Sequence, residues 1–138
     1  MKPTTVANTA RIRILIVDDK ERVRQDLRTA LGLMEGLEVI GEAADGLEAL
    51  HQAEKLSPDV VLMDLKMPRM DGFEAAQQIK DRHLARGVVA LTLYGDTTTR
   101  KRAASAGVDA FVEKGASIHT LNDIIRQVSS KVSSPGPD

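Results

Sequence analysis

Three aspartates stand directly after short apolar runs and are the side chains best suited to chemistry. Asp18 and Asp19 follow residues 12–17, and Asp64 follows residues 60–63. If these runs are strands, the carboxylates meet at one end of a sheet, where each raises the pKa of its neighbours unless a cation lies between them. A hard divalent ion with oxygen ligands, such as Mg²⁺, is the expected occupant. Asp18 and Asp19 are therefore candidate metal ligands, and Asp64 is the candidate reactive carboxylate.

Two further polar residues stand at the ends of predicted strands. Thr92 lies near the end of one apolar run, and Lys114 directly follows residues 110–113. A hydroxyl and an ammonium beside a metal-bound carboxylate match the needs of phosphoryl transfer, which are a nucleophile, charge neutralisation and donors to the equatorial oxygens. We predict that Asp64 is phosphorylated, that Lys114 pairs with the phosphoryl group or with Asp64, and that Thr92 hydrogen-bonds the phosphoryl oxygens.

The elements that must position these residues alternate along the chain. Apolar runs predict strands at residues 12–17, 37–42, 60–64, 88–93 and 110–113. Apolar residues three or four positions apart predict five helices, whose inward faces carry Val23, Leu27, Ala30, Leu31 and Met34; Leu47, Leu50 and Ala53; Ala76, Ile79 and His83; Ala103, Ala104 and Ala106; and Ile118, Leu121, Ile124, Ile125, Val128 and Val132. The fourth helix, capped by Asp96 or Thr97, has only small apolar residues and is the candidate mobile element.

Strands that alternate with helices predict an α/β fold whose parallel sheet is covered on both faces. Right-handed crossovers and short loops favour a flavodoxin-like, (βα)5 doubly wound sheet with strand order 2-1-3-4-5. Strands 1 and 3 are neighbours in that order, and the winding reverses between them. Ligands bind such folds at the carboxyl ends of these strands, where Asp18, Asp19 and Asp64 are expected.

Length and composition bound the remaining possibilities. The 138 residues fit one domain, and 42% hydrophobic with 28% charged residues is a globular composition. Charges nearly balance, with 19 Lys and Arg against 20 Asp and Glu, so no global attraction to DNA or membrane is expected. The chain has no cysteine and no bilayer-length apolar stretch, which indicates a cytoplasmic protein without membrane contact. Residues 1–10 are expected to be a flexible lead-in, 11–132 the domain, and 133–138 a linker or disordered tail.

Four separated motifs resemble those of one family. They are Ile16-Val17-Asp18-Asp19, Met63-Asp64-Leu65-Lys66-Met67-Pro68-Arg69-Met70-Asp71-Gly72, Leu91-Thr92 and Phe111-Val112-Glu113-Lys114. Together they resemble the receiver domain of two-component response regulators, over residues 11–132. The segment at residues 36–46 is similar to receivers that precede a LuxR/NarL-type DNA-binding domain.

The resemblance implies a phosphoryl switch. Asp64 would take its phosphoryl group from a sensor histidine kinase, with Mg²⁺ also bound by the backbone carbonyl of Lys66. Thr92 would move toward the phosphate, the Phe111 ring would change rotamer, and the face formed by helix 4, strand 5 and helix 5 would be remodelled. The resemblance also implies homodimerisation on phosphorylation, and contact with DNA only through an output domain that is absent from this chain. Such a domain catalyses its own phosphorylation and dephosphorylation but turns over no external substrate.

Three departures from the family pattern concern the same site. Gly115 stands where the family often has proline after Lys114, and Leu93 is bulkier than the small residue often found after Thr92, which would narrow access to the phosphoryl site. Lys66 and Tyr94 occupy the positions at which the family tunes the phosphate lifetime.

Other functions stay open from the residues alone. One is a Mg²⁺-dependent phosphohydrolase with an aspartyl nucleophile, although Lys66 stands where a general acid would be wanted. Another is a flavin or nucleotide carrier, against which the sequence after residue 17 lacks a glycine-rich phosphate loop. A receiver could also act alone by binding partners, or belong to a longer transcription factor.

Overall fold

Strands and helices alternate through residues 11–67, 69–93 and 96–133, which are the residues that this computed structural model describes. In chain order the elements are β1 (Ile12–Val17), α1 (Glu21–Gly32), β2 (Leu37–Ala43), α2 (Gly46–Leu56), β3 (Val60–Asp64), α3 (Gly72–Asp81), β4 (Gly87–Thr92), α4 (Thr97–Ser105), β5 (Ala110–Glu113) and α5 (Ile118–Ser133). The predictions for residues 1–10, for Tyr94 and for residues 134–138 lie outside these ranges. Within them, no helix combines the length and the apolar character needed to cross a membrane.

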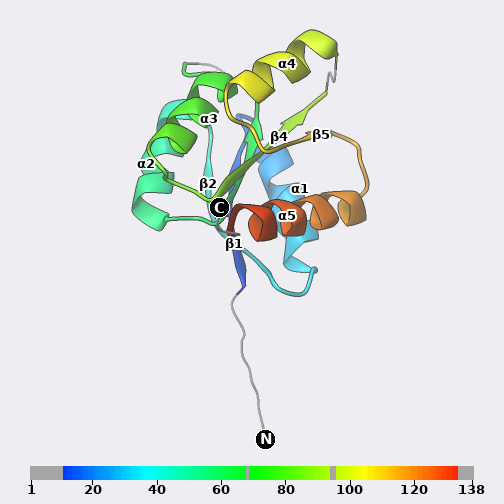
Figure 1. The fold of residues 1–138 in the computed structure, drawn as a ribbon. Coiled ribbons are helices and arrows are strands. Elements are labelled where there is room, and N and C mark those ends of the chain that lie inside the picture. Colours follow the sequence, from blue (N-terminus) through cyan, green and yellow to red (C-terminus); the bar gives the residue numbers. More distant parts are fainter. Residues whose placement is uncertain (1–10, 68, 94–95, 134–138) are drawn as a thin grey trace, which may run out of the picture.

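The sheet has the strand order that the sequence predicted. The order is β2-β1-β3-β4-β5, and every neighbouring pair is parallel. Helices α1 and α5 cover one face, while α2, α3 and α4 cover the other (Figure 1). The carboxyl ends of β1 and β3 are therefore adjacent at the point where the winding reverses, which confirms the predicted place of the candidate site.

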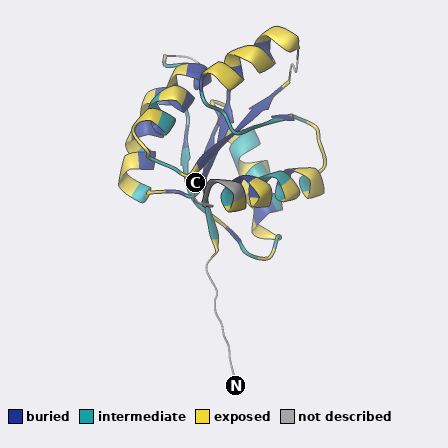
Figure 2. Ribbon diagram, in the orientation of Figure 1, coloured by how far each residue is buried: buried dark blue, intermediate teal, exposed yellow. Residues whose placement is uncertain are grey.

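The central strand β3 is buried on both faces. All five of its residues are buried (Figure 2). Alternate side chains enter two separate apolar clusters. Val61 and Met63 pack with the α2, α3 and α4 side, whereas Val60 and Leu62 pack with the α1 and α5 side. Burial of this apolar surface stabilises the fold and fixes the strand in position. The carboxylate of Asp64 is thus carried by a strand whose residues are all buried.

Two helix faces differ from the prediction. Leu47 was expected inside but is 52% exposed, because the buried face of α2 is formed by Gly46, Ala49, Leu50 and Ala53 and leaves Leu47 beside it. Ala104 is also exposed, since α4 turns Ala103 inward instead. Both predictions were wrong for the same reason: apolar spacing defines a face only to within about one residue, and small side chains such as glycine and alanine occupied the inward positions.

The ends of α3 and β4 also differ from the prediction. His83 was expected on the buried side of α3 but is exposed, because the helix ends at Asp81 and His83 has a φ of +55°. The N–H of Leu84 then donates to the carbonyl of Ile79, 2.9 Å away, a helix-ending bond that leaves His83 in the solvent. Leu93 was expected within β4, yet the strand ends at Thr92 and Leu93 is 66% exposed.

Helix α4 has the sparse apolar anchoring that its composition suggested. Only Thr99 and Ala103 are buried among its residues, and Asp96 caps it by accepting a hydrogen bond of 2.7 Å from the N–H of Thr99. Two arginines add contacts to aromatic rings: Arg100 lies 4.4 Å from the centroid of Phe111, and Arg102 lies 4.0 Å from that of Phe73. Little apolar burial therefore holds this helix, and its mobility stays a prediction.

We expect Gly72→Ala to destabilise the fold by about 2 kcal/mol or more. A Cβ atom at this position would lie 2.2 Å from the carbonyl oxygen of Asp64, so the backbone that carries the reactive carboxylate would have to move. Gly32→Ala is the matched control, since a Cβ there meets nothing within 4 Å. Urea denaturation of the two variants measures the difference, and equal stabilities would show that the close approach at Gly72 is unimportant.

Candidate functional site

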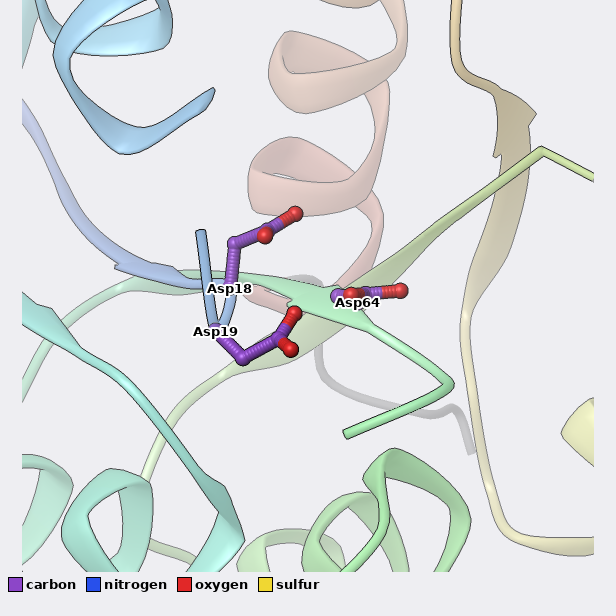
Figure 3. Close-up of side chains that lie close together, drawn as sticks. All are labelled: Asp18, Asp19 and Asp64. Atoms are coloured by element: carbon purple, nitrogen blue, oxygen red, sulfur yellow. The ribbon is translucent and has the colours of Figure 1, made fainter. Parts of the chain in front are cut away.

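The three carboxylates meet at the carboxyl ends of β1 and β3. Asp18 and Asp19 are the first two residues after β1, and Asp64 is the last residue of β3. One oxygen from each lies within 4.8 Å of the others, and the three side chains lie close together (Figure 3). Asp18 and Asp64 are buried, with 1% and 5% of their surface exposed, whereas Asp19 is exposed. The structure therefore brings together the three residues predicted as a cluster.

Lys114 faces two of these carboxylates. Its Nζ lies 2.7 Å from Oδ2 of Asp18 and 3.5 Å from Oδ2 of Asp64. The position is fixed by the backbone, because the N–H of Lys114 donates to the carbonyl of Thr92 over 2.7 Å and so continues the β4–β5 pairing. Burial acts to lower the pKa of Lys114, but the hydrogen bond to Asp18 and the charge of Asp64 outweigh it and raise the pKa. The ammonium is therefore held in its charged form.

Asp64 is a carboxyl group in an unfavourable place for a charge. Burial is the main cause that raises its pKa, and the negative charges of Asp18 and Asp19 raise it further. The N–H of Lys66, which donates to Oδ1 over 3.2 Å, and the ammonium of Lys114 act in the opposite direction without cancelling the rise. The ionised carboxylate is thus short of compensating positive charge.

A small cavity opens on the outer side of Asp64. Its volume is about 160 Å³, and it is lined by Lys20, Asp64, Lys66, Thr92, Leu93 and Lys114. Thr92 is 2% exposed, so its hydroxyl belongs to the inner wall, whereas Leu93 stands at the exposed side. The predicted partners of Asp64 therefore share one cavity with it. Leu93 lines that cavity as expected, and its effect on access stays a prediction.

The donor set fits a divalent cation. Three carboxylates converge, one half-buried ammonium faces two of them, and a negative charge is left over that a hard cation with oxygen ligands would neutralise. The oxygens of Asp18, Asp19 and Asp64 are the residues that would hold it.

The support around Asp18 was not found from the sequence. Oδ1 of Asp18 accepts a hydrogen bond of 2.9 Å from the N–H of Lys20, and its backbone carbonyl accepts one of 2.6 Å from Arg24. Arg24 is itself held by Glu42 of β2, 2.8 Å away. Arg24 follows Asp18 by six residues on the first turn of α1, which is the signal that might have drawn attention to it. Asp18 is thereby oriented before any ligand arrives.

Phe111 lies apart from this cavity. It is half-buried on β5, packs against the cluster on the α2, α3 and α4 side, and carries the guanidinium of Arg100 over its ring. Its partner in the sheet is Ala90, two residues before Thr92 on β4. The residue predicted to change rotamer is thus connected to the site through β4 and to α4 through Arg100.

Comparisons with known proteins agree with the fold and identify the family. The family model described as the response regulator receiver domain matches residues 14–126, which is most of the chain. The chain therefore belongs to the response-regulator receiver family, as the sequence motifs predicted.

Two relatives are named as regulators. The transcriptional regulatory protein PdtaR of Mycobacterium tuberculosis is 42% identical over 94% of this chain, and the response regulator protein VraR of Staphylococcus aureus is 41% identical over 86% of it. The matches cover 62% and 56% of these two proteins, so the chain spans about three fifths of the length of the relatives that it matches.

Solved structures agree on the fold and on the subfamily resemblance. The response regulator domain of CheB from Thermotoga maritima is 29% identical with a TM-score of 0.82, and the match covers 91% of this chain and 99% of that one. The receiver domain of the putative regulator NarL from Mycobacterium tuberculosis is 25% identical with a TM-score of 0.84, over 88% and 98%. The likeness to NarL and VraR accords with the predicted LuxR/NarL type.

The raised pKa of Asp64 predicts that Asp64→Asn stabilises the protein when no divalent ion is present. The folded protein binds this proton more readily than the unfolded chain, so the free energy of unfolding falls as pH rises from about 3.9 through the raised folded pKa. An asparagine at this position does not ionise, so the variant does not lose this stability as the pH rises. In a chelating buffer its Tm should exceed that of the wild type near pH 7 and approach it toward about pH 4. A variant less stable than the wild type near pH 7 would contradict the assigned cause.

Proposed function

We propose that this chain is a phosphoryl-accepting switch and that Asp64 is the residue phosphorylated. The observation that carries the proposal is the shared geometry of Asp18, Asp19, Asp64 and Lys114, in which three carboxylates and one ammonium from three strand ends meet beside a cavity of about 160 Å³. The donor is a histidine kinase, in keeping with the family. Self-catalysed phosphorylation and dephosphorylation are part of this proposal.

The transfer needs a nucleophile and a neutralised charge. An oxygen of Asp64 attacks phosphorus, the new O–P bond forms as the P–N bond to the donor histidine breaks, and the imidazole keeps the electron pair and then takes a proton from solvent. Lys114 is placed to pair with the incoming phosphoryl oxygens, since its Nζ already lies 3.5 Å from Asp64. Thr92, on the wall of the same cavity, supplies a hydroxyl donor.

Mg²⁺ would be held by Asp18, Asp19 and Asp64 together with the backbone carbonyl of Lys66. Bound there, the ion supplies neutralisation of the charge that develops on the phosphoryl oxygens. The protein contributes the fixed positions: Asp18 is held by Lys20 and Arg24, and Asp64 by the N–H of Lys66. These orienting bonds support the ligand assignment because they hold the carboxylates of Asp18 and Asp64 in place before an ion binds.

We propose that phosphorylation changes the conformation of the face formed by α4, β5 and α5. Phosphorylation of Asp64 would alter the charge balance around Lys114 and draw Thr92 toward the phosphate, with a rotamer change of Phe111. The contact between Arg100 and Phe111 supports the route, because movement of the ring would remove a contact that holds α4. We infer that this face forms a homodimer on phosphorylation.

The wider role is also a proposal. The relatives PdtaR and VraR are named as regulators, and we infer transcription as the controlled process, with DNA contacted through an output domain and the chain located in the cytoplasm. Regulation by protein binding alone is the alternative. The hydrolase alternative is less favoured, because the other described residues that line the cavity of Asp64 are three lysines, a threonine and a leucine and offer no carboxylic acid.

Phosphorylation of Asp64 can be tested by intact mass. Incubation with Mg²⁺ and a small acyl phosphate should add one phosphoryl group to the wild type, and alkali should remove it. Asp64→Asn should remain unmodified, because the amide lacks the nucleophilic oxygen. Without Mg²⁺, the wild type should show little adduct.

The matched control is Asp71→Asn. Asp71 caps α3, where its side chain accepts a hydrogen bond of 3.0 Å from the N–H of Glu74, and an asparagine keeps that capping oxygen. This variant should be phosphorylated like the wild type. A phosphoryl group that persists in Asp64→Asn would place the acceptor on another residue and end the proposal.

The switch can be followed through the two phenylalanines of the chain. Fluorine-labelled phenylalanine gives two NMR signals, from Phe73 and Phe111, which point mutants assign. Phosphorylation should shift the Phe111 signal more than the Phe73 signal, because the Phe111 ring itself changes rotamer, whereas the Phe73 ring on α3 senses α4 through its contact with Arg102. Equal, small shifts at both positions would contradict a rotamer change at Phe111.

A further inference from the structure

The loop after Asp64 is held in an unusual backbone conformation. The described residues of this β3–α3 loop, 65–67 and 69–71, include Lys66, whose carbonyl we assigned to the metal. Arg69 in the same loop has a φ of +64°, a region that residues with a side chain rarely adopt. Such a conformation persists only where the surroundings fix it. The contacts of Arg69 identify what fixes it here.

Arg69 is paired with an aspartate of the neighbouring connection. Its Nε donates to Oδ2 of Asp45 over 3.0 Å, and its second guanidinium nitrogen donates to the same oxygen. Asp45 caps α2, because its Oδ1 accepts a hydrogen bond of 2.8 Å from the N–H of Glu48. One carboxylate therefore joins the start of α2 to the loop that follows Asp64.

A backbone hydrogen bond also connects this loop to the start of α2. The N–H of Gly46 donates to the carbonyl of Met70 over 3.1 Å, and a Cβ on Gly46 would lie 2.3 Å from that oxygen. The loop thus lies directly against the first residue of α2, at a distance that glycine alone allows. The loop is held at Arg69 and Met70, three and four residues beyond Lys66.

The side chains of Asp45 and Arg69 differ in how far they are buried. The side chain of Asp45 is 4% exposed and that of Arg69 is 68% exposed, so the carboxylate depends on the guanidinium much more than the reverse. The hydrogen bond from Arg69 is the main cause that lowers the pKa of Asp45, followed by that from Glu48. Removal of Arg69 would leave a buried carboxylate with only its cap bonds, which is a stronger perturbation than loss of an ordinary surface ion pair.

We propose that Arg69 is a positioning residue: its pair with Asp45 holds the β3–α3 loop so that the Lys66 carbonyl can complete the Mg²⁺ site. This inference rests on the proposed function. Arg69 is not itself a ligand of the ion or of the phosphoryl group. It acts through the loop: its long cationic side chain starts from a strained backbone position and reaches a buried carboxylate.

The test measures Mg²⁺ affinity by calorimetry on the unphosphorylated protein, together with hydrogen exchange of the Gly46 amide in a chelating buffer. Arg69→Ala should weaken Mg²⁺ binding by about tenfold, as loss of an orienting partner commonly does. It should also speed exchange of the Gly46 amide, which donates to Met70. Arg69→Lys keeps the positive charge and should recover most of the affinity.

Arg82→Ala is the matched control. Arg82 is also an exposed arginine paired with a carboxylate, since its guanidinium lies 3.1 Å from Glu54, but it stands beyond the far end of α3. It should leave both measurements unchanged. Should Arg69→Ala fail to fold, Asp45→Asn keeps a capping oxygen on α2 while removing the charged partner, and it should weaken Mg²⁺ binding in the same direction.

The outcomes separate the two proposals. If the wild type binds Mg²⁺ and Arg69→Ala binds it equally well, the positioning role is wrong and the proposed function stands. A fall in Tm without a change in Mg²⁺ affinity would likewise assign Arg69 to stability alone and overturn the role. If the wild type itself takes up no Mg²⁺, the proposed function fails, and the positioning role fails with it.

Discussion

Three carboxylates held within 4.8 Å of one another are the constraint on which the rest of this structure depends. Like charges at such distances repel, and burial removes the water that would screen them. The fold must therefore supply enough apolar packing elsewhere to keep the strand ends in place. It does so through β3, which is buried on both faces and draws its packing from two separate clusters. A site of this kind requires a strand that has no exposed face.

The single ammonium of Lys114 is shared by carboxylates from two strands. It lies closer to Asp18 than to Asp64, at 2.7 Å against 3.5 Å, so Asp64 has the weaker partner. A phosphoryl group on Asp64 would offer Lys114 a stronger one. Lys114 directly follows β5, and its backbone N–H is hydrogen-bonded to Thr92 of β4. Any change in the ion pairs of Lys114 therefore affects β4 and β5 together. The electrostatics of the site are thus coupled to one side of the sheet.

The sequence predicted the strand order and the convergence of Asp18, Asp19, Asp64, Thr92 and Lys114, because apolar runs locate strands and parallel strands place their carboxyl ends at one edge. It did not predict that Leu47 and His83 face solvent, since glycine and alanine formed the buried face of α2 and α3 ended early. The pair of Asp45 and Arg69 was also missed. Those residues stand 24 positions apart on two connections, and periodicity carries no information about contacts between loops.

The two sides of the site differ in how firmly they are held. On the side of α2 and α3, buried residues and the joins at Gly46, Met70 and Gly72 fix the loop after Asp64 against backbone atoms. On the side of α4, burial is limited and arginine contacts to aromatic rings do much of the holding. Contacts of the second kind are worth about 1 kcal/mol each and are reversible at little cost. A change of charge at Asp64 is therefore expected to move α4 more easily than α2 and α3. This difference determines which side of the domain responds in the proposed switch.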